Sequence, residues 1–544
     1  MLRVAKLDLF PRMTLVIAVL GIVFLLISQP AHARPKTADE AQAAVQTWLQ
    51  KVLTEGPENF SVQSMEPYQY QGGTVAYIAH LWGGGYCLVG ADDLSRPIIY
   101  YGLEGEYDPT NPGLRFFLEN TGQSLLALRT AVNDRSLKLQ PIQDKLQARA
   151  DLWSDLIAGR KPVNKTALTT ADVPDYLVLP LTSKWHQNAP YNLDTPYPIG
   201  PPNDMISSKV GCLATAMSQV MYYWKWPTRG ASSRQVFWAN HHFDYWNTRP
   251  LDTDPGIDPA KWSGRLEWTD TTSPPELRIG GVWDGSMYTN ALKESTDPAY
   301  QSAVASIWQD SQIEFRVVEG DFQNTYYDWD LMQDEHFSAD GIDAGDLEAA
   351  RLGFQAACAV DMNWGRYVSL ATTGDVPWRM PGYFKYDTDM TYISHNSQVM
   401  IEDLSWSRPL IFRASNATGG GHAWVVFGYD ISSGIEIFMI NLGWGPSSIG
   451  WFTLDDINLD YYLNLAHVSK IAPEYSVRFV GSNNPFGDGT PSSPYFSLST
   501  ALINAPDDVT FILQAGSTNV ISGAAAVIDS PHVIKGLGAI ITYE

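Results

Sequence analysis

The stretch VGCLATAMSQVMYYWKWP at residues 210–227 is the part of the sequence that most constrains the fold. Apolar side chains recur at helical spacing over residues 213–224, which predicts a helix that begins next to Cys212. The unpaired amides at a helix N-terminus carry a partial positive charge, which lowers the pKa of a thiol and favours the nucleophilic thiolate. Taken alone, the segment fits a small buried core cysteine at least as well.

Two glycine-rich segments downstream carry the other candidate residues. In GGGHAWVVFGYD (419–430), His422 opens an apolar strand, and glycine before it allows the close approach that suits the rim of a cleft. In NLGWG (441–445), the side chain of Asn441 is placed to accept a hydrogen bond from an imidazole and fix its tautomer. Taken alone, each segment also fits a structural histidine at a strand edge or a simple turn. Together with Cys212 they supply the thiol, imidazole and orienting group that a cysteine peptidase needs.

The chain resembles the streptopain family of cysteine peptidases. The resemblance rests on four ordered segments: TSKWHQNAPYN (182–192), VGCLATAMSQVMYYWKWP (210–227), GGGHAWVVFGYD (419–430) and NLGWGPSSIGWFTLD (441–455). A fifth, GGGYCLVGADDLSRPIIYYGLEGEYD (83–108), is similar to the family's propeptide, so the resemblance covers roughly 37–472. The order cysteine, histidine, asparagine is that of papain-like enzymes, although the papain-type nucleophile signature is absent.

The resemblance implies a role for each matching residue. Cys212 would attack the scissile carbonyl, and His422 would hold the proton as an ion pair and pass it to the leaving amine. Gln187 would donate its side-chain amide to the oxyanion, beside the backbone N–H of Cys212. Asn441 would orient His422. The supporting residues at the cleft are Gly211, Gly421 and Trp444.

One residue departs from the family pattern. The family usually has tryptophan directly after the asparagine, where this chain has Leu442, and Trp444 matches the family's second tryptophan. Two alternatives to a peptidase therefore stay open: a catalytically weak or dead homologue that acts as a binding protein, and a papain-like acyltransferase with the same nucleophile and base.

The fold implied is α+β, a papain-like two-lobed arrangement with a helical half and an antiparallel β half. It would carry an α+β propeptide and a small C-terminal β extension. The expected divisions are a signal peptide (1–33), an inhibitory propeptide (34–160), a processing linker (161–178), the peptidase domain (179–474) and a C-terminal β-rich extension (475–544).

The first 33 residues indicate an exported protein. A basic start, the apolar run MTLVIAVLGIVFLLIS (13–28) and the small-x-small pattern at 31–33 are typical of a cleaved signal peptide, so we expect secretion without a stable membrane anchor. The net charge of −23 disfavours nucleic-acid partners. The expected partners are protein or peptide substrates and the chain's own propeptide.

The remaining motifs predict no cofactor and no metal. There are three cysteines, and Cys87 and Cys358 both lie in apolar runs that predict core packing. The Asp-rich stretches 252–258 and 340–348 lack the spacing of a calcium loop, so we interpret them as solvated loops. The sequence also predicts a helix over 37–55 with a Thr37–Glu40 capping box, and long surface loops over 250–345.

Overall fold

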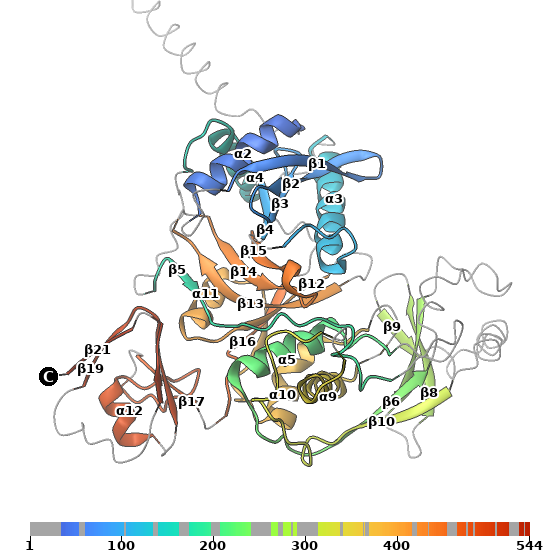
Figure 1. Cartoon of the computed structure of the whole chain (residues 1–544), viewed down its shortest axis with the longest axis vertical. Coiled ribbons are helices and arrows are strands. Elements are labelled where there is room, and N and C mark those ends of the chain that lie inside the picture. Colours follow the sequence, from blue (N-terminus) through green and yellow to red (C-terminus); the bar gives the residue numbers. More distant parts are fainter. Residues whose placement is uncertain are drawn as a thin grey trace, which may run out of the picture. The chain divides into compact units, whose positions relative to one another are not determined.

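The computed structural model describes most of the chain (Figure 1). The described residues are 34–53, 60–102, 105–133, 140–162, 173–196, 207–240, 263–269, 276–283, 287–290, 314–337, 341–362, 364, 369–415, 421–432, 435–453, 465–474, 477–481, 485–505, 509–521, 533–537 and 539–543. The chain divides into two compact units. The first comprises 1–82, 87–99 and 121–162, and the second comprises 83–86, 100–120 and 163–544.

The first unit is built from helices and a hairpin. Its elements, some of which extend into the second unit, are α2 (Ala38–Lys51), β1 (Val62–Tyr70), β2 (Gly73–Leu81), β3 (Tyr86–Gly90), β4 (Ile98–Gly102), α3 (Pro112–Asn133) and α4 (Gln140–Ile157). The predicted capping box at the start of α2 is confirmed, because Thr37 and Glu40 satisfy each other's backbone amides. Strands β1 and β2 are antiparallel, α2 packs on α4, and Trp48 and Trp153 are fully buried.

An antiparallel sheet forms the centre of the second unit. Its order is β4–β15–β14–β13–β12–β16–β11, and β5 pairs with the last residues of β13. The strands are β5 (Tyr176–Val178), β11 (Thr391–Ser394), β12 (Leu410–Ser415), β13 (Gly421–Asp430), β14 (Ile437–Asn441), β15 (Ile449–Phe452) and β16 (Ala466–Ser469). Strand β13 is buried along nearly all its length, as its apolar run predicts.

Helices pack against this sheet and against one another. Helix α5 (Cys212–Trp224) contacts β12 and β13 on one side and α9 (Ala344–Ala359) on the other. Helix α10 (Val376–Phe384) contacts α9, and α11 (Ser397–Ser405) lies on β12, β13 and β16 (Figure 1). Two 3-10 turns, η3 (Thr373–Asp375) and η4 (Pro446–Ser448), complete this part. Helices beside an antiparallel sheet confirm the α+β prediction.

The prediction of loops over 250–345 is wrong for part of the described residues and holds for 321–337, which are turns and irregular segments. The residues that differ include a three-stranded antiparallel sheet of β7 (Ser263–Thr269), β8 (Glu276–Trp283) and β9 (Met287–Asn290). Strand β10 (Glu314–Gly320) pairs with β6 (Arg234–Asn240). Clustered Asp, Pro and Gly hid the alternation that identifies strands.

The residues after 475 form a small unit of parallel strands. Strands β17 (Val477–Val480), β18 (Thr510–Leu513) and β20 (Val533–Lys535) are parallel, as are β19 (Thr518–Ile521) and β21 (Ile540–Tyr543), and α12 (Leu498–Asn504) lies beside them. The signal segment 1–33 and linker residues 163–172 lie outside the described residues. Across the described part, no helix has the length and hydropathy needed to cross a bilayer.

Candidate active site

Cys212 is the first residue of α5, close to its predicted position. The preceding Gly211 has φ 99°, a backbone conformation that side chains disfavour, and a Cβ there would lie 2.5 Å from Cε of Met362. Because α5 packs against β13, the tight turn at Gly211 brings Cys212 to the strand that carries His422.

The thiol of Cys212 meets that strand directly. The backbone N–H groups of Ala423 on β13, of Leu213 and of Cys212 itself lie close enough to the sulfur to stabilise the thiolate. These amides lower the pKa of the thiol, but burial has the larger effect, so the pKa of Cys212 stands above its ordinary value. Cys212 is nevertheless partly exposed, whereas Cys87 and Cys358 are fully buried with their pKa values raised by burial. The prediction of core packing for those two is confirmed.

His422 lies on β13, directly before Ala423, in a buried position. It is 8% exposed, and burial lowers its pKa to about 4, against a smaller upward effect of a hydrogen bond. That bond joins its Nε2 to the backbone carbonyl of Leu442 at 2.9 Å. With a raised thiol pKa and a lowered imidazole pKa, the full-length chain favours the neutral forms of both groups.

Asn441 does not contact the imidazole in this form. Its Nδ2 donates to the carbonyl of Ser183 at 2.7 Å and to Oε1 of Gln219 at 2.6 Å, and its Oδ1 accepts from the N–H of Gly443 at 2.9 Å. Asn441 is fully buried. Its side chain therefore fixes the turn that presents the Leu442 carbonyl to His422.

Gln187 lies on a loop that is held by a hydrogen bond and a β-bridge. Its carbonyl accepts from the N–H of Val210, near the start of α5, and its neighbour His186 forms a β-bridge with Trp444. Gln187 is 3% exposed, yet its Nε2 has no hydrogen-bond partner among the described residues. A buried amide without a partner is costly, so this nitrogen is a candidate donor to a ligand oxygen.

The start of α3 covers the histidine. Phe116 lies against His422 with ring centroids 6.1 Å apart, and Phe117 lies 5.5 Å from Trp424. A Cβ on Gly113 would come within 3.1 Å of a Leu442 carbon, so the helix backbone sits close to the Leu442 side chain. These α3 residues contribute to the burial that lowers the pKa of His422.

The comparisons with known proteins concern the part of the chain that contains these residues. A model of the peptidase C10 family matches residues 185–264 and 296–452. Over these residues the chain is similar to the peptidase C10 family. The chain is 20% identical to streptopain of Streptococcus pyogenes over 395 residues, which are 71% of this chain and 75% of streptopain. The prediction of a streptopain-type cysteine peptidase is confirmed.

Two further proteins match the chain. The chain is 26% identical over 190 residues to the thiol protease/hemagglutinin PrtT of Porphyromonas gingivalis, covering 32% of this chain and only 20% of PrtT. A solved fragment of prointerpain A from Prevotella intermedia is 20% identical and covers 74% of this chain and 97% of that fragment, with a TM-score of 0.47.

A separate cluster of metal-binding residue types has a structural role. His336, Asp343 and Asp346 bring ligand atoms within 4.8 Å of one another. Nδ1 of His336 bonds Asp346 at 2.9 Å and its Nε2 accepts from the N–H of Gln333 at 3.0 Å, while the two aspartates form the capping box of α9. No lone pair of the imidazole is left for a cation. The interpretation of 340–348 as a solvated loop is therefore wrong for the residues that begin α9.

Two contributors to the site escaped the sequence analysis. The first is the Leu442 carbonyl, a backbone acceptor that cannot be predicted from a pattern of side chains. Gln219, fully buried on α5, joins Asn441 to the nucleophile helix. A glutamine facing inward on an otherwise apolar helix was the available signal.

Proposed function

We propose that the chain is a secreted cysteine endopeptidase made as an inactive precursor, with Cys212 as nucleophile and His422 as base. The observation that carries this proposal is the contact between the Cys212 sulfur and the N–H of Ala423, the residue directly after His422. A partly exposed thiol at a helix start, next to the strand that carries a buried imidazole, suits nucleophilic catalysis.

In this proposal the two imidazole nitrogens have different roles, one as hydrogen-bond donor and one as proton acceptor. With Nε2–H donating to the Leu442 carbonyl, Nδ1 carries the lone pair that takes the thiol proton. The thiolate attacks the scissile carbonyl carbon, and the imidazolium returns the proton to the leaving amine. Water then hydrolyses the acyl-enzyme. In this scheme Asn441 acts by fixing the turn at Leu442 and Gly443.

Gln187 is proposed as an oxyanion donor. Its Nε2 is buried and lacks a partner, so the negative oxygen of the tetrahedral intermediate would satisfy it together with the N–H of Cys212. One such donor contributes about 3 kcal/mol to transition-state stabilisation. Trp444, Gly421 and Gly211 are proposed to support the cleft around the thiol.

The contacts of α3 support inhibition by the segment that precedes the peptidase. Phe116 lies on His422, and the pKa directions at Cys212 and His422 oppose an ion pair. Cleavage in the linker (161–178) would release residues 34–160 and admit water and substrate to the imidazole. The peptidase domain would then span 179–474, followed by the extension 475–544. Residues 1–33 would act as the export signal.

Self-processing provides the test. Wild type and Cys212→Ser are expressed in a secreting host and incubated under reducing conditions, and products are followed by gel mass, N-terminal sequencing and casein hydrolysis. We expect wild type to gain an N-terminus within 161–178 and to cut casein, while Cys212→Ser stays at full length and inert. If both proteins behave alike and neither cuts casein, the catalytic proposal is wrong.

A further inference from the structure

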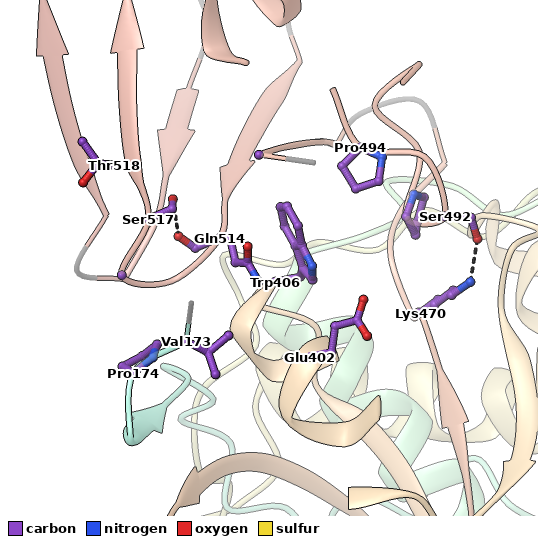
Figure 2. Close-up of a pocket in the computed structure, with 13 residues that line it drawn as sticks. Val173, Pro174, Glu402, Trp406, Lys470, Ser492, Pro494, Gln514, Ser517 and Thr518 are labelled. Atoms are coloured by element: carbon purple, nitrogen blue, oxygen red, sulfur yellow. Dashed lines mark hydrogen bonds between the residues drawn. The ribbon is translucent and has the colours of Figure 1, made fainter. Parts of the chain in front are cut away.

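A cavity lies between the residues of α11 and the C-terminal strands, away from the catalytic candidates (Figure 2). Its volume is about 870 Å³, within the range of about 300–1,000 Å³ typical of small-molecule sites. Neither Cys212 nor His422 lines it. Helix α11 supplies Glu402 and Trp406, and the residues after 475 supply much of the remaining wall, including Gln514 and Thr518.

The wall at Lys470 is held by a buried ion pair. Lys470 has φ 62°, a left-handed conformation that is unfavourable for a residue with a side chain. Its N–H donates to the carboxylate of Asp403, which is 1% exposed and pairs with Arg408 at 2.7 Å. Arg408 in turn donates to the carbonyl of Pro491, another residue of the wall. These bonds hold the backbone at Lys470 and Pro491 in place before any ligand binds.

On the other side of the cavity, hydrogen bonds and a ring contact join the C-terminal strands to α11. The N–H of Ala515 donates to the carbonyl of Ser405 at 2.8 Å, and Nε2 of Gln514 donates to the Ser405 hydroxyl at 3.3 Å. The indole of Trp406 packs edge-on against Phe479 on β17, 5.9 Å between centroids. The cavity is thus a fixed feature of this unit.

The polar groups that face the cavity have unused hydrogen-bonding capacity. The Glu402 carboxylate has no hydrogen bond with a described residue, which leaves two acceptor oxygens. The Lys470 ammonium donates to Ser492 at 2.6 Å, which leaves two of its N–H groups and the Ser492 hydroxyl proton (Figure 2). The Thr518 hydroxyl, also in the wall, both donates and accepts.

The chemistry of the wall selects a class of ligand. One carboxylate and one ammonium leave the wall without net charge, which disfavours a strongly charged polymer. The apolar part of the wall consists of Val173, the rings of Pro174, Pro491 and Pro494, and the edge of the largely buried Trp406, without long aliphatic chains. Donors and acceptors interspersed with flat apolar faces suit a ring that carries hydroxyls on its edge and C–H groups on its face.

We propose that this cavity binds a short neutral oligosaccharide. The Glu402 carboxylate and the Lys470 ammonium bind its hydroxyls from two sides, and Gln514 and Thr518 add bonds from the C-terminal strands. The extension thereby completes a carbohydrate site, which would hold the peptidase near glycan-bearing material while the Cys212 region acts on protein.

The test uses the full chain with Cys212→Ala, so it does not depend on proteolysis. Maltose, lactose, cellobiose and N,N′-diacetylchitobiose are titrated by calorimetry and by saturation-transfer NMR. We expect at least one to bind with a Kd of about 1 mM or tighter. Glu402→Gln, an isosteric change at an exposed side chain, should weaken binding about tenfold, as should Lys470→Met.

The control is Glu319→Gln, an exposed residue on β10, which should leave the Kd within about twofold. Thermal unfolding of each variant shows whether it folds. Two results would overturn the proposal: no binding by any of the four sugars, or binding that Glu402→Gln and Lys470→Met leave unchanged while both fold normally. Preferential binding of charged peptides at this cavity would likewise replace it.

Discussion

Phe116→Ala in the full-length chain should raise the pKa of His422. Burial holds that pKa near 4, against an ordinary value of 6.5, a difference of roughly 3 kcal/mol in favour of the neutral ring. Among the described residues, Phe116 and Trp424 are the aromatic rings within 6.1 Å of the imidazole, and alanine in place of Phe116 admits water on that side. We expect at least a tenfold increase in proton affinity, which moves the pKa toward 5 or higher.

The assay is an NMR titration of the histidine ring protons in full-length Cys212→Ala, with and without Phe116→Ala. In the Cys212 background, the rate of iodoacetamide reaction at pH 6–8 provides a second readout, because a more basic imidazole favours the thiolate. Phe486→Ala is the matched control, since Phe486 is 90% exposed and lies in the extension. An unchanged pKa near 4 together with an unchanged alkylation rate would refute the role given to Phe116.

Three further substitutions test the packing around the site. Burial lowers the pKa of His467 to about 4, with a smaller effect of His395, so its contribution to stability is complete above pH 6.5 and falls by about 3 kcal/mol as the pH drops from 6.5 to 4. His467→Phe should flatten the dependence of urea unfolding on pH in that window, and an unchanged slope would contradict this. Gly211→Ala should destabilise the chain by about 1–3 kcal/mol and reduce turnover, because its φ is 99° and Met362 blocks a Cβ; normal urea midpoint and turnover would argue against it. Gln219→Met leaves two buried donors without their acceptor, one of them on Asn441, so we expect a loss of about 1–3 kcal/mol in urea unfolding and a lower kcat at unchanged KM; a variant with wild-type stability would show that Gln219 is dispensable.

The parts of the fold with a strong local signal could be predicted from the sequence. The capping box of Thr37 and Glu40 begins α2 as expected, and the apolar period after Gly211 predicts α5 almost to the residue. The apolar run after His422 predicts β13. In each case the hydrophobic period and the terminal residues indicate the same element.

The hydrogen bonds of the site could not be predicted in the same way. The residue that matches the family's orienting asparagine binds Ser183 and Gln219, and His422 instead bonds a main-chain carbonyl. Every residue has a main-chain carbonyl, so a sequence motif cannot show which one will accept a hydrogen bond. The burial of His422 by Phe116 depends on a contact across about three hundred residues of sequence, which local patterns do not encode.

The most direct test of the account is to follow modification of Cys212 and activity in the same sample. Processed enzyme is treated with increasing iodoacetamide, casein hydrolysis is measured at each step, and peptide mapping by mass spectrometry reports the fraction of each cysteine alkylated. We predict that activity falls in proportion to alkylation of Cys212, while buried Cys87, if retained, and Cys358 stay unmodified. Full activity in enzyme whose Cys212 is completely alkylated would contradict the assignment of this residue as the nucleophile.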